Sequence, residues 1–124
     1  MARIRLRSVV LDCPDPVALA GFYGQLLDGR VVTTDPAWSE VHLDEVGIKL
    51  AFQRVDAYRP PQWPAGTPQQ LHWDLTVDEL VQSSARAVEL GASVLGEPVQ
   101  EDNCTFVVHA DPAGHPFCLC VSDD

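Results

Sequence analysis

The chain has 124 residues, of which 46% are hydrophobic, and this length allows one compact domain but not two independent ones. Eight Lys and Arg residues stand against 18 Asp and Glu residues, which gives a formal net charge of −10 at pH 7. This charge repels phosphate backbones and anionic lipid surfaces. We therefore expect no nucleic-acid or membrane partner and favour a cationic or neutral small-molecule ligand.

The sequence also bears on the compartment and on the state of the cysteines. No run of about 18 apolar residues occurs, as a membrane-spanning helix would need, and residues 3–7 alternate arginine with aliphatic residues instead of entering the apolar core of a signal peptide. We therefore expect a cytoplasmic protein. The cysteines lack CxxC spacing and would stay reduced there, so neither a disulfide framework nor a zinc knuckle is predicted. They are Cys13, Cys104, Cys118 and Cys120.

The first half of the chain predicts one helix and four strands. Alternating or β-branched residues indicate strands at 4–11, 30–34, 38–43 and 48–55. Asp15 followed by Pro16 is typical of a helix start, and apolar residues keep helical spacing from there until Gly29. The order of elements is therefore βαβββ.

The second half repeats this order. A strand is predicted at 71–77, a helix at 78–91, and further strands at 93–95, 105–109 and 116–121. The proline-rich segment 58–68 fits neither a helix nor a central strand, and its Trp63 could act as a lid over a ligand. We therefore expect a single domain over residues 1–124, with module one at 1–57, a linker at 58–69 and module two at 70–124.

A short repeated string supports an internal duplication. Residues 41–47 and 108–114 share Val, His, Asp and Gly at matching places, and each string leads into a hydrophobic strand. One such match is weak by itself, but it falls inside a repeated order of elements. The string gives His42 and His109 equivalent positions, which favours a structural role for both. The sequence does not assign these two histidines to one face of the sheet, because a bulge could precede each last strand.

Five sequence motifs resemble one known family. They are LDCPD at 11–15, GFY at 21–23, LHWDL at 71–75, ELGA at 89–92 and DPAGHPFCLC at 111–120. In this order they are similar to the glyoxalase-like branch of the vicinal oxygen chelate superfamily, the group of glyoxalases, bleomycin resistance proteins and dioxygenases. The resemblance implies an α+β fold in which two tandem βαβββ modules form a half-open, cup-shaped, eight-stranded mixed sheet around a ligand. It also implies a homodimer.

Many members of that family hold a divalent metal in the cup. The resemblance places the metal ligands at four positions of this chain, namely Ser8, His72, Cys118 and either Lys49 or Ala51. Only His72 is a good ligand, whereas the ion needs three or four converging imidazole and carboxylate groups. Asp12 or Asp74 could contribute only from two residues farther along a strand, about 6.5 Å away. We therefore predict no metal and no other cofactor.

Strand alternation predicts which side chains face the cup of the resembled fold. On the first strands these are Ser8, Val10, Asp12, His72, Asp74 and Thr76, and on the last strands they are Lys49, Ala51, Gln53, Cys118 and Cys120. The intervening residues should pack under the helices: Val9, Leu11, Trp73, Leu75, Val77, Leu50, Phe52, Phe117 and Leu119. The candidate ligand-binding residues are Ser8, Val10, Lys49, Gln53, Thr76, Cys118 and Cys120.

A few cup-facing residues could carry chemistry. His72 could act as an acid–base pair with Asp12 or Asp74, and either carboxylate could bind a cationic group. His72 could equally be a hydrogen-bonded residue with no present chemistry, and the carboxylates could simply be solvated. Cys118 and Cys120 could form a redox or soft-metal site, although small buried thiols more often serve packing.

Three function classes stay open. The favoured one is a metal-independent binding protein for a small molecule, of a sequestering or resistance type. The alternative is an enzyme of the lyase, isomerase, hydrolase or dioxygenase kind, which would use His72 with Asp12 or Asp74, with or without a divalent metal. A dimerising scaffold without a pocket is the third. The sequence does not name the ligand, because this fold hosts unrelated chemistries.

Overall fold

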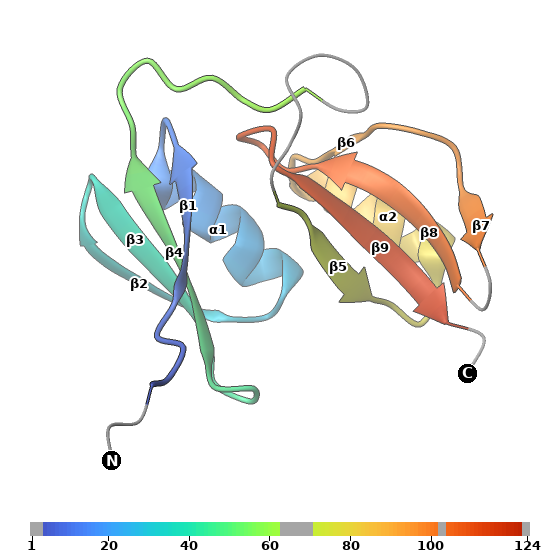
Figure 1. Ribbon diagram of the computed structural model, residues 1–124, viewed down its shortest axis with the longest axis horizontal. Coiled ribbons are helices and arrows are strands. Elements are labelled where there is room, and N and C mark those ends of the chain that lie inside the picture. The colour runs from blue at the N-terminus through green and yellow to red at the C-terminus, as the bar shows by residue number, and fades with distance from the viewer. Residues whose placement is uncertain (1–3, 63–70, 102–103, 123–124) are drawn as a thin grey trace. The chain divides into compact units, whose positions relative to one another are not determined.

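The computed structural model describes residues 4–62, 71–101 and 104–122. The chain divides into two compact units, Met1–Tyr58 (unit one) and Arg59–Asp124 (unit two), and each contains one helix and one mixed sheet (Figure 1). Within the described residues, neither helix is long and apolar enough to cross a membrane. The hypothesis of a lid at Trp63 and most of the predicted linker lie outside the described residues.

Unit one has the predicted βαβββ order. Its elements are β1 (Val9–Cys13), α1 (Pro16–Leu26), β2 (Arg30–Asp35), β3 (Trp38–Leu43) and β4 (Ile48–Arg54). The sheet order is β1-β4-β3-β2, in which β1 runs parallel to β4 and the other pairs are antiparallel. Because β1 and β4 are neighbours, the first and last strands of the unit lie side by side.

Helix α1 begins and packs as its sequence predicts. The Asp15 side chain caps its first turn by accepting a hydrogen bond from the Ala18 backbone N–H at 3.2 Å, and Pro16 takes a position where no N–H is needed. The buried face of α1 carries Phe22 and Tyr23, and the Tyr23 ring stacks on Phe52 of β4 with 5.7 Å between ring centroids. The core of unit one therefore lies between α1 and one face of the sheet.

Unit two repeats the arrangement with one additional break. Its elements are β5 (Trp73–Thr76), α2 (Leu80–Leu90), β6 (Ser93–Val94), β7 (Val99–Glu101), β8 (Cys104–Ala110) and β9 (Pro116–Ser122). Strand β5 runs parallel to β9, β9 pairs with β8, and both β6 and β7 pair with β8. Glu79 caps α2 by accepting hydrogen bonds from two backbone N–H groups, and Gly91 ends it with a positive φ of 123°.

The described residues form nine strands where eight were expected. The difference is at one edge of the second sheet, where Ser93 lies opposite Ala110 and Glu101 lies opposite Cys104, at the two ends of β8. Strands β6 and β7 thus share the place that β2 holds in unit one, and the segment 95–98 between them contains Pro98, which cannot donate to a ladder. The α+β architecture of two βαβββ modules is confirmed.

Strand β1 is shorter than predicted. The expected strand 4–11 begins only at Val9, and Ile4 is 98% exposed. In the described sheet β1 pairs with β4, whose first residue is Ile48, and Val9 already lies opposite Leu50. Residues before position 7 would therefore extend beyond the end of β4, where they have no strand residue to pair with.

The repeated string does not superimpose in the structure. In unit one, Val41 lies opposite Leu50 on the buried face of the sheet. In unit two, the corresponding position opposite Phe117 is occupied by His109 and not by Val108. The two strings are offset by one residue because four residues separate β3 from β4, whereas five separate β8 from β9. The expectation that His42 and His109 are equivalent is therefore wrong, although the order of elements is repeated.

The longer turn explains the DPAGH motif in structural terms. The Asp111 side chain accepts hydrogen bonds from the backbone N–H groups of Ala113 and His115, at 2.8 and 3.0 Å. Gly114 has a φ of 92°, and a Cβ atom there would come within 2.5 Å of Pro60. Glycine at this position therefore satisfies both the backbone conformation and the close approach of the chain at Pro60.

Candidate functional site

The cross-strand register tests the predicted faces of both sheets. Val10 lies opposite Ala51 and Asp12 opposite Gln53, while Asp74 lies opposite Cys118 and Thr76 opposite Cys120. Each of these pairs is on the sheet face away from the helix. The residues between them are on the helix side, and those that are buried there are Leu11, Leu50, Phe52, Phe117 and Leu119. Alternation thus predicted the faces correctly.

The register also settles which residue of β4 corresponds to Cys118. With Ser8 equivalent to His72, Val10 is equivalent to Asp74, and Ala51 therefore corresponds to Cys118. Lys49, the other candidate, lies on the same face two residues before Ala51. Ser8 lies just before the first residue of β1. A hydroxyl and a methyl group replace two of the expected metal ligands, so these positions of unit one provide no metal site.

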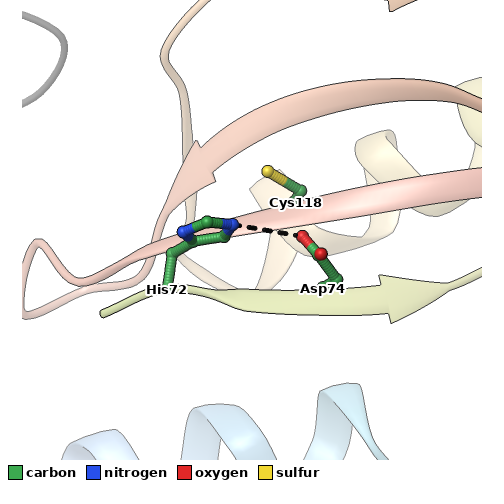
Figure 2. A group of neighbouring side chains, drawn as sticks. All are labelled: His72, Asp74 and Cys118. Atoms are coloured by element: carbon green, nitrogen blue, oxygen red, sulfur yellow. Dashed lines mark ion pairs between the residues drawn. The ribbon is translucent and has the colours of Figure 1, made fainter. Parts of the chain in front are cut away.

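Three side chains converge in unit two. Figure 2 shows His72 and Asp74 pointing toward one another, with Cys118 beside them on the neighbouring strand. His72 Nε2 lies 3.4 Å from Asp74 Oδ1, and the nitrogen, oxygen and sulfur atoms of the three residues all lie within 4.8 Å of one another. The side chains of His72 and Asp74 are 38% and 67% exposed, whereas Cys118 is only 3% exposed.

This convergence corrects the distance argument made from strand spacing. Two residues along a strand separate Cα atoms by about 6.5 Å, but the imidazole and the carboxylate lean toward one another along the strand edge and close that gap to 3.4 Å. His72 precedes β5, which begins at Trp73. Asp74 is therefore a neighbour of His72 and not a remote carboxylate.

The Cys118 thiol is held in its neutral form. Its pKa is raised to about 11, mainly by burial and then by the negative charge of Asp74 and a hydrogen bond with Asp74. At neutral pH Cys118 therefore contributes a protonated thiol to the cluster. A protonated thiol is a poor nucleophile, so covalent catalysis by Cys118 is disfavoured.

The three residues fit a borderline ion better than a hard one. Nitrogen, oxygen and sulfur donors together suit zinc, which binds such atoms at about 2.0–2.3 Å. The Cys118 thiol would have to lose its proton on binding. The set contains one imidazole and one carboxylate, so it does not reproduce the ligands that the resemblance implies.

A polar network in unit one was not recognised in the sequence. The Trp38 indole N–H donates to Glu40 Oε2 at 2.9 Å, His42 Nε2 lies 2.8 Å from Glu40 Oε1, and Arg30 Nη2 donates to His42 Nδ1 at 3.2 Å. Since Arg30 can only donate, Nδ1 of His42 accepts and Nε2 carries the proton. Arg30 also binds Asp44 through two hydrogen bonds of 3.1 Å.

Glu40 is the charged centre of this network. The hydrogen bond from Trp38 lowers its pKa most, followed by the hydrogen bond with His42, so Glu40 stays ionised. Glu40 lies opposite Ala51, on the same face as Asp12, whose Oδ1 accepts a 2.7 Å hydrogen bond from Gln53. The sequence signal for this network was the alternation of Trp38, Glu40 and His42 along β3, which places the three side chains on one face of the strand.

His109 has a structural role, as predicted. It is buried on the helix side, where Nε2 lies 2.8 Å from the Ser84 hydroxyl of α2 and Nδ1 lies 3.1 Å from the Val107 carbonyl. Its ring stacks on Phe117. Burial lowers the pKa of His109, so the imidazole is neutral in the folded protein.

Two units with parallel first and last strands, each with polar side chains on the face away from its helix, define an α+β protein of the glyoxalase type. The family model described as "Glyoxalase-like domain" matches residues 8–120. The chain therefore belongs to the glyoxalase-like domain family, within the vicinal oxygen chelate superfamily. No curated protein shows a significant match to the chain.

Solved structures share this fold at low sequence identity. A glyoxalase/bleomycin resistance protein/dioxygenase family enzyme from Burkholderia phytofirmans has a TM-score of 0.76 and 18% identity, and the match covers 96% of this chain and 99% of that one. A glyoxalase-related enzyme from Fulvimarina pelagi has a TM-score of 0.73, 19% identity and coverage of 97% and 89%. The oxidase ChaP-H2 has a TM-score of 0.70, 19% identity and coverage of 99% and 100%. These likenesses establish the fold and leave the chemistry to the site.

Proposed function

We propose that the protein binds a small cationic or neutral molecule on the sheet face that lies away from the helices, without the divalent metal that the family resemblance implies. The observation that carries this proposal is the pair formed by His72 and Asp74 beside the neutral thiol of Cys118. Both side chains are substantially exposed. They are therefore accessible to a ligand and are not needed to fill the core.

The chemistry of the pair supports this ligand class. Asp74 can accept hydrogen bonds from an ammonium or amide group, and the His72 imidazole lies beside it in Figure 2. The corresponding face of unit one carries two further carboxylates, Asp12 and Glu40. With a net charge of −10, these groups favour a cation or a hydrogen-bond donor over an anion.

A matched ligand screen tests the proposal. Benzylamine, benzamide and benzoate share one scaffold and differ in charge, and we expect thermal stabilisation by the first two only. Asp74→Asn should weaken that binding at least tenfold, whereas Glu89→Gln should not, because it removes the same charge from an exposed site on α2. Stabilisation by benzoate alone, or equal effects of the two variants, would overturn the proposal.

A second candidate is an enzyme that uses His72 with Asp74 as an acid–base pair. It is favoured by the three donor atoms within 4.8 Å, which suit zinc. A zinc ion held by His72, Asp74 and Cys118 would act as a Lewis acid toward a substrate oxygen, whereas without zinc Asp74 would orient the His72 imidazole as its acid–base partner. Calorimetric titration with Zn²⁺ separates the two candidates: stoichiometric binding that His72→Ala abolishes supports the enzyme, and its absence supports the metal-free binding protein.

We also propose that the protein forms a homodimer, which the family resemblance implies. Sedimentation equilibrium over a range of concentrations tests this point, because a dimer doubles the mass of 13.6 kDa. A monomer at all concentrations would refute it without affecting the proposed ligand site.

A further inference from the structure

Three of the four cysteines lie on one face of the sheet in unit two. Cys118 and Cys120 alternate along β9 and both point away from α2. On β8, Phe106 lies opposite Cys120 and Cys104 lies opposite Ser122, so Cys104 shares that face and is the diagonal neighbour of Cys120. Sequence alternation had grouped Cys118 with Cys120 but had not brought Cys104 to them, because this requires the register between β8 and β9.

Cys120 is the thiol that neighbours the other two, Cys118 along β9 and Cys104 diagonally on β8. All are in the reduced form, with Cys118 buried and the other two half-buried. The pKa of Cys120 is raised to about 12. Burial is the largest cause, followed by the charge of Asp74 and by the charge and a hydrogen bond of Cys104. The same Cys104 also acts on Cys118. The Cys104 thiol is therefore close enough to Cys120 to contribute to the raised pKa of that residue.

Their location distinguishes these thiols from a packing cysteine. Cys13 in unit one shows the packing case, because it lies on the helix side of its sheet with no exposed surface. Cys104 and Cys120 instead keep partial exposure on the face that carries His72, Asp74 and Thr76. Packing alone does not require three thiols on this face.

We propose that Cys104 and Cys120 form a binding site for a soft, thiophilic metal ion such as Cu(I). Soft ions select thiolate ligands. A thiolate–metal bond of about 2.3 Å lets one ion bridge two sulfur atoms up to about 4.6 Å apart. This separation suits diagonal neighbours on antiparallel strands, whose Cα atoms lie about 7–8 Å apart, whereas a disulfide requires Cα atoms closer than about 7 Å. This site uses other donor atoms than the neighbouring His72–Asp74 pair and does not depend on the proposed ligand.

Binding of the ion has a defined proton balance. Cu(I) replaces the thiol protons of Cys104 and Cys120, so one ion bound releases two protons and no electron is transferred. Because the ion competes with protons, affinity should rise with pH. Proton release in weakly buffered solution is therefore a second readout, independent of any activity.

A competition titration tests the site. The reduced whole chain is titrated anaerobically with Cu(I) in the presence of the coloured chelator bicinchoninate. We expect the protein to remove one equivalent of Cu(I) from the chelator. Cys104→Ala and Cys120→Ala should each lower the affinity at least tenfold. Cys13→Ala removes a thiol from the other unit, and His72→Ala removes the imidazole, so both should bind Cu(I) as the wild type does.

Each outcome decides the question. Equal Cu(I) binding by the wild type, Cys104→Ala and Cys120→Ala overturns the proposal, as does the absence of binding. Loss of binding in His72→Ala with retention in Cys104→Ala also overturns it, and assigns the ion to the cluster of His72, Asp74 and Cys118. If Cys120→Ala fails to fold by circular dichroism, the half-exposed Cys104→Ala carries the test alone.

Discussion

His72 Nε2 lies 3.4 Å from Asp74 Oδ1 on the sheet face away from α2. Both side chains are substantially exposed, and an exposed ion pair contributes only about 0–1 kcal/mol to stability. The pair is therefore not explained by the needs of the fold. Its accessible position beside Cys118 is the feature on which the proposed ligand site depends.

The first prediction separates a ligand-binding role of His72 from a structural one. His72→Ala should change the free energy of unfolding by less than about 1 kcal/mol, because the side chain is exposed and its ion pair is weak. It should lower the affinity for a stabilising ligand at least tenfold. Thermal melts and calorimetric titration measure the two effects. His115→Ala is the matched control, and normal ligand affinity in His72→Ala would leave His72 as a structural residue.

The second prediction concerns helix packing in unit one. A Cβ atom at Gly24 of α1 would come within 2.5 Å of the Val31 side chain, whereas a Cβ atom at Gly21 meets nothing within 4 Å. Gly24→Ala should therefore destabilise the protein by about 1–3 kcal/mol. Gly21→Ala should stabilise it by up to about 1 kcal/mol, because alanine is the better helix former. Urea denaturation of both variants tests this, and equal effects of the same sign would contradict the tight contact with β2.

The third prediction is a pH dependence caused by His109. Burial lowers the pKa of this imidazole in the folded state, so below its usual value of about 6.5 the unfolded chain takes up a proton that the folded chain excludes. The stability that the neutral His109 imidazole contributes is therefore lost as the pH falls from 7 through 6.5 toward the lowered folded-state pKa. His109→Gln should be less stable at pH 7, but its stability should decline less between pH 7 and pH 5.

Urea titrations at several pH values measure this difference. Glu40 also has a lowered pKa, but its usual value of 4.5 places most of its effect below pH 5, outside this window. Parallel stability curves for the wild type and His109→Gln would show that His109 is not the group responsible.

Much of the fold could be predicted because local signals agree with it. Pro16 and Gly91 mark a helix start and a helix end, and alternation gave the faces of β1, β4, β5 and β9. The interruption between β6 and β7 was missed because Val99–Glu101 is short and pairs with only part of β8. The faces of His42 and His109 could not be assigned, since one extra turn residue reverses a strand's faces.

The candidate site was only partly accessible to sequence reasoning. Alternation placed His72, Asp74 and Cys118 on one face and offered either Asp12 or Asp74 as a partner of His72. It gives Cα spacing and not the direction in which a side chain leans, so it did not predict that His72 and Asp74 approach to 3.4 Å. Glu40 and Cys104 depend on pairing between neighbouring strands, and that register follows from turn lengths that the sequence left undetermined.

The last prediction is that the purified protein retains far less than one divalent metal ion per chain at the family position after dialysis. Ala51 and the neutral hydroxyl of Ser8 provide no anionic donor in unit one. In unit two, His72 and Asp74 are available, but the third donor, Cys118, must first lose a proton from a thiol whose pKa is raised to about 11. That proton competes with the ion most strongly at neutral and acidic pH, so any residual zinc binding should strengthen as the pH rises. Elemental analysis of dialysed protein at pH 7 and pH 9, with His72→Ala as the control, measures this. Stoichiometric zinc, nickel or iron at pH 7 that is lost in His72→Ala would overturn the metal-free proposal and support the second candidate. It would show that one imidazole, one carboxylate and one buried thiol are enough to hold the ion.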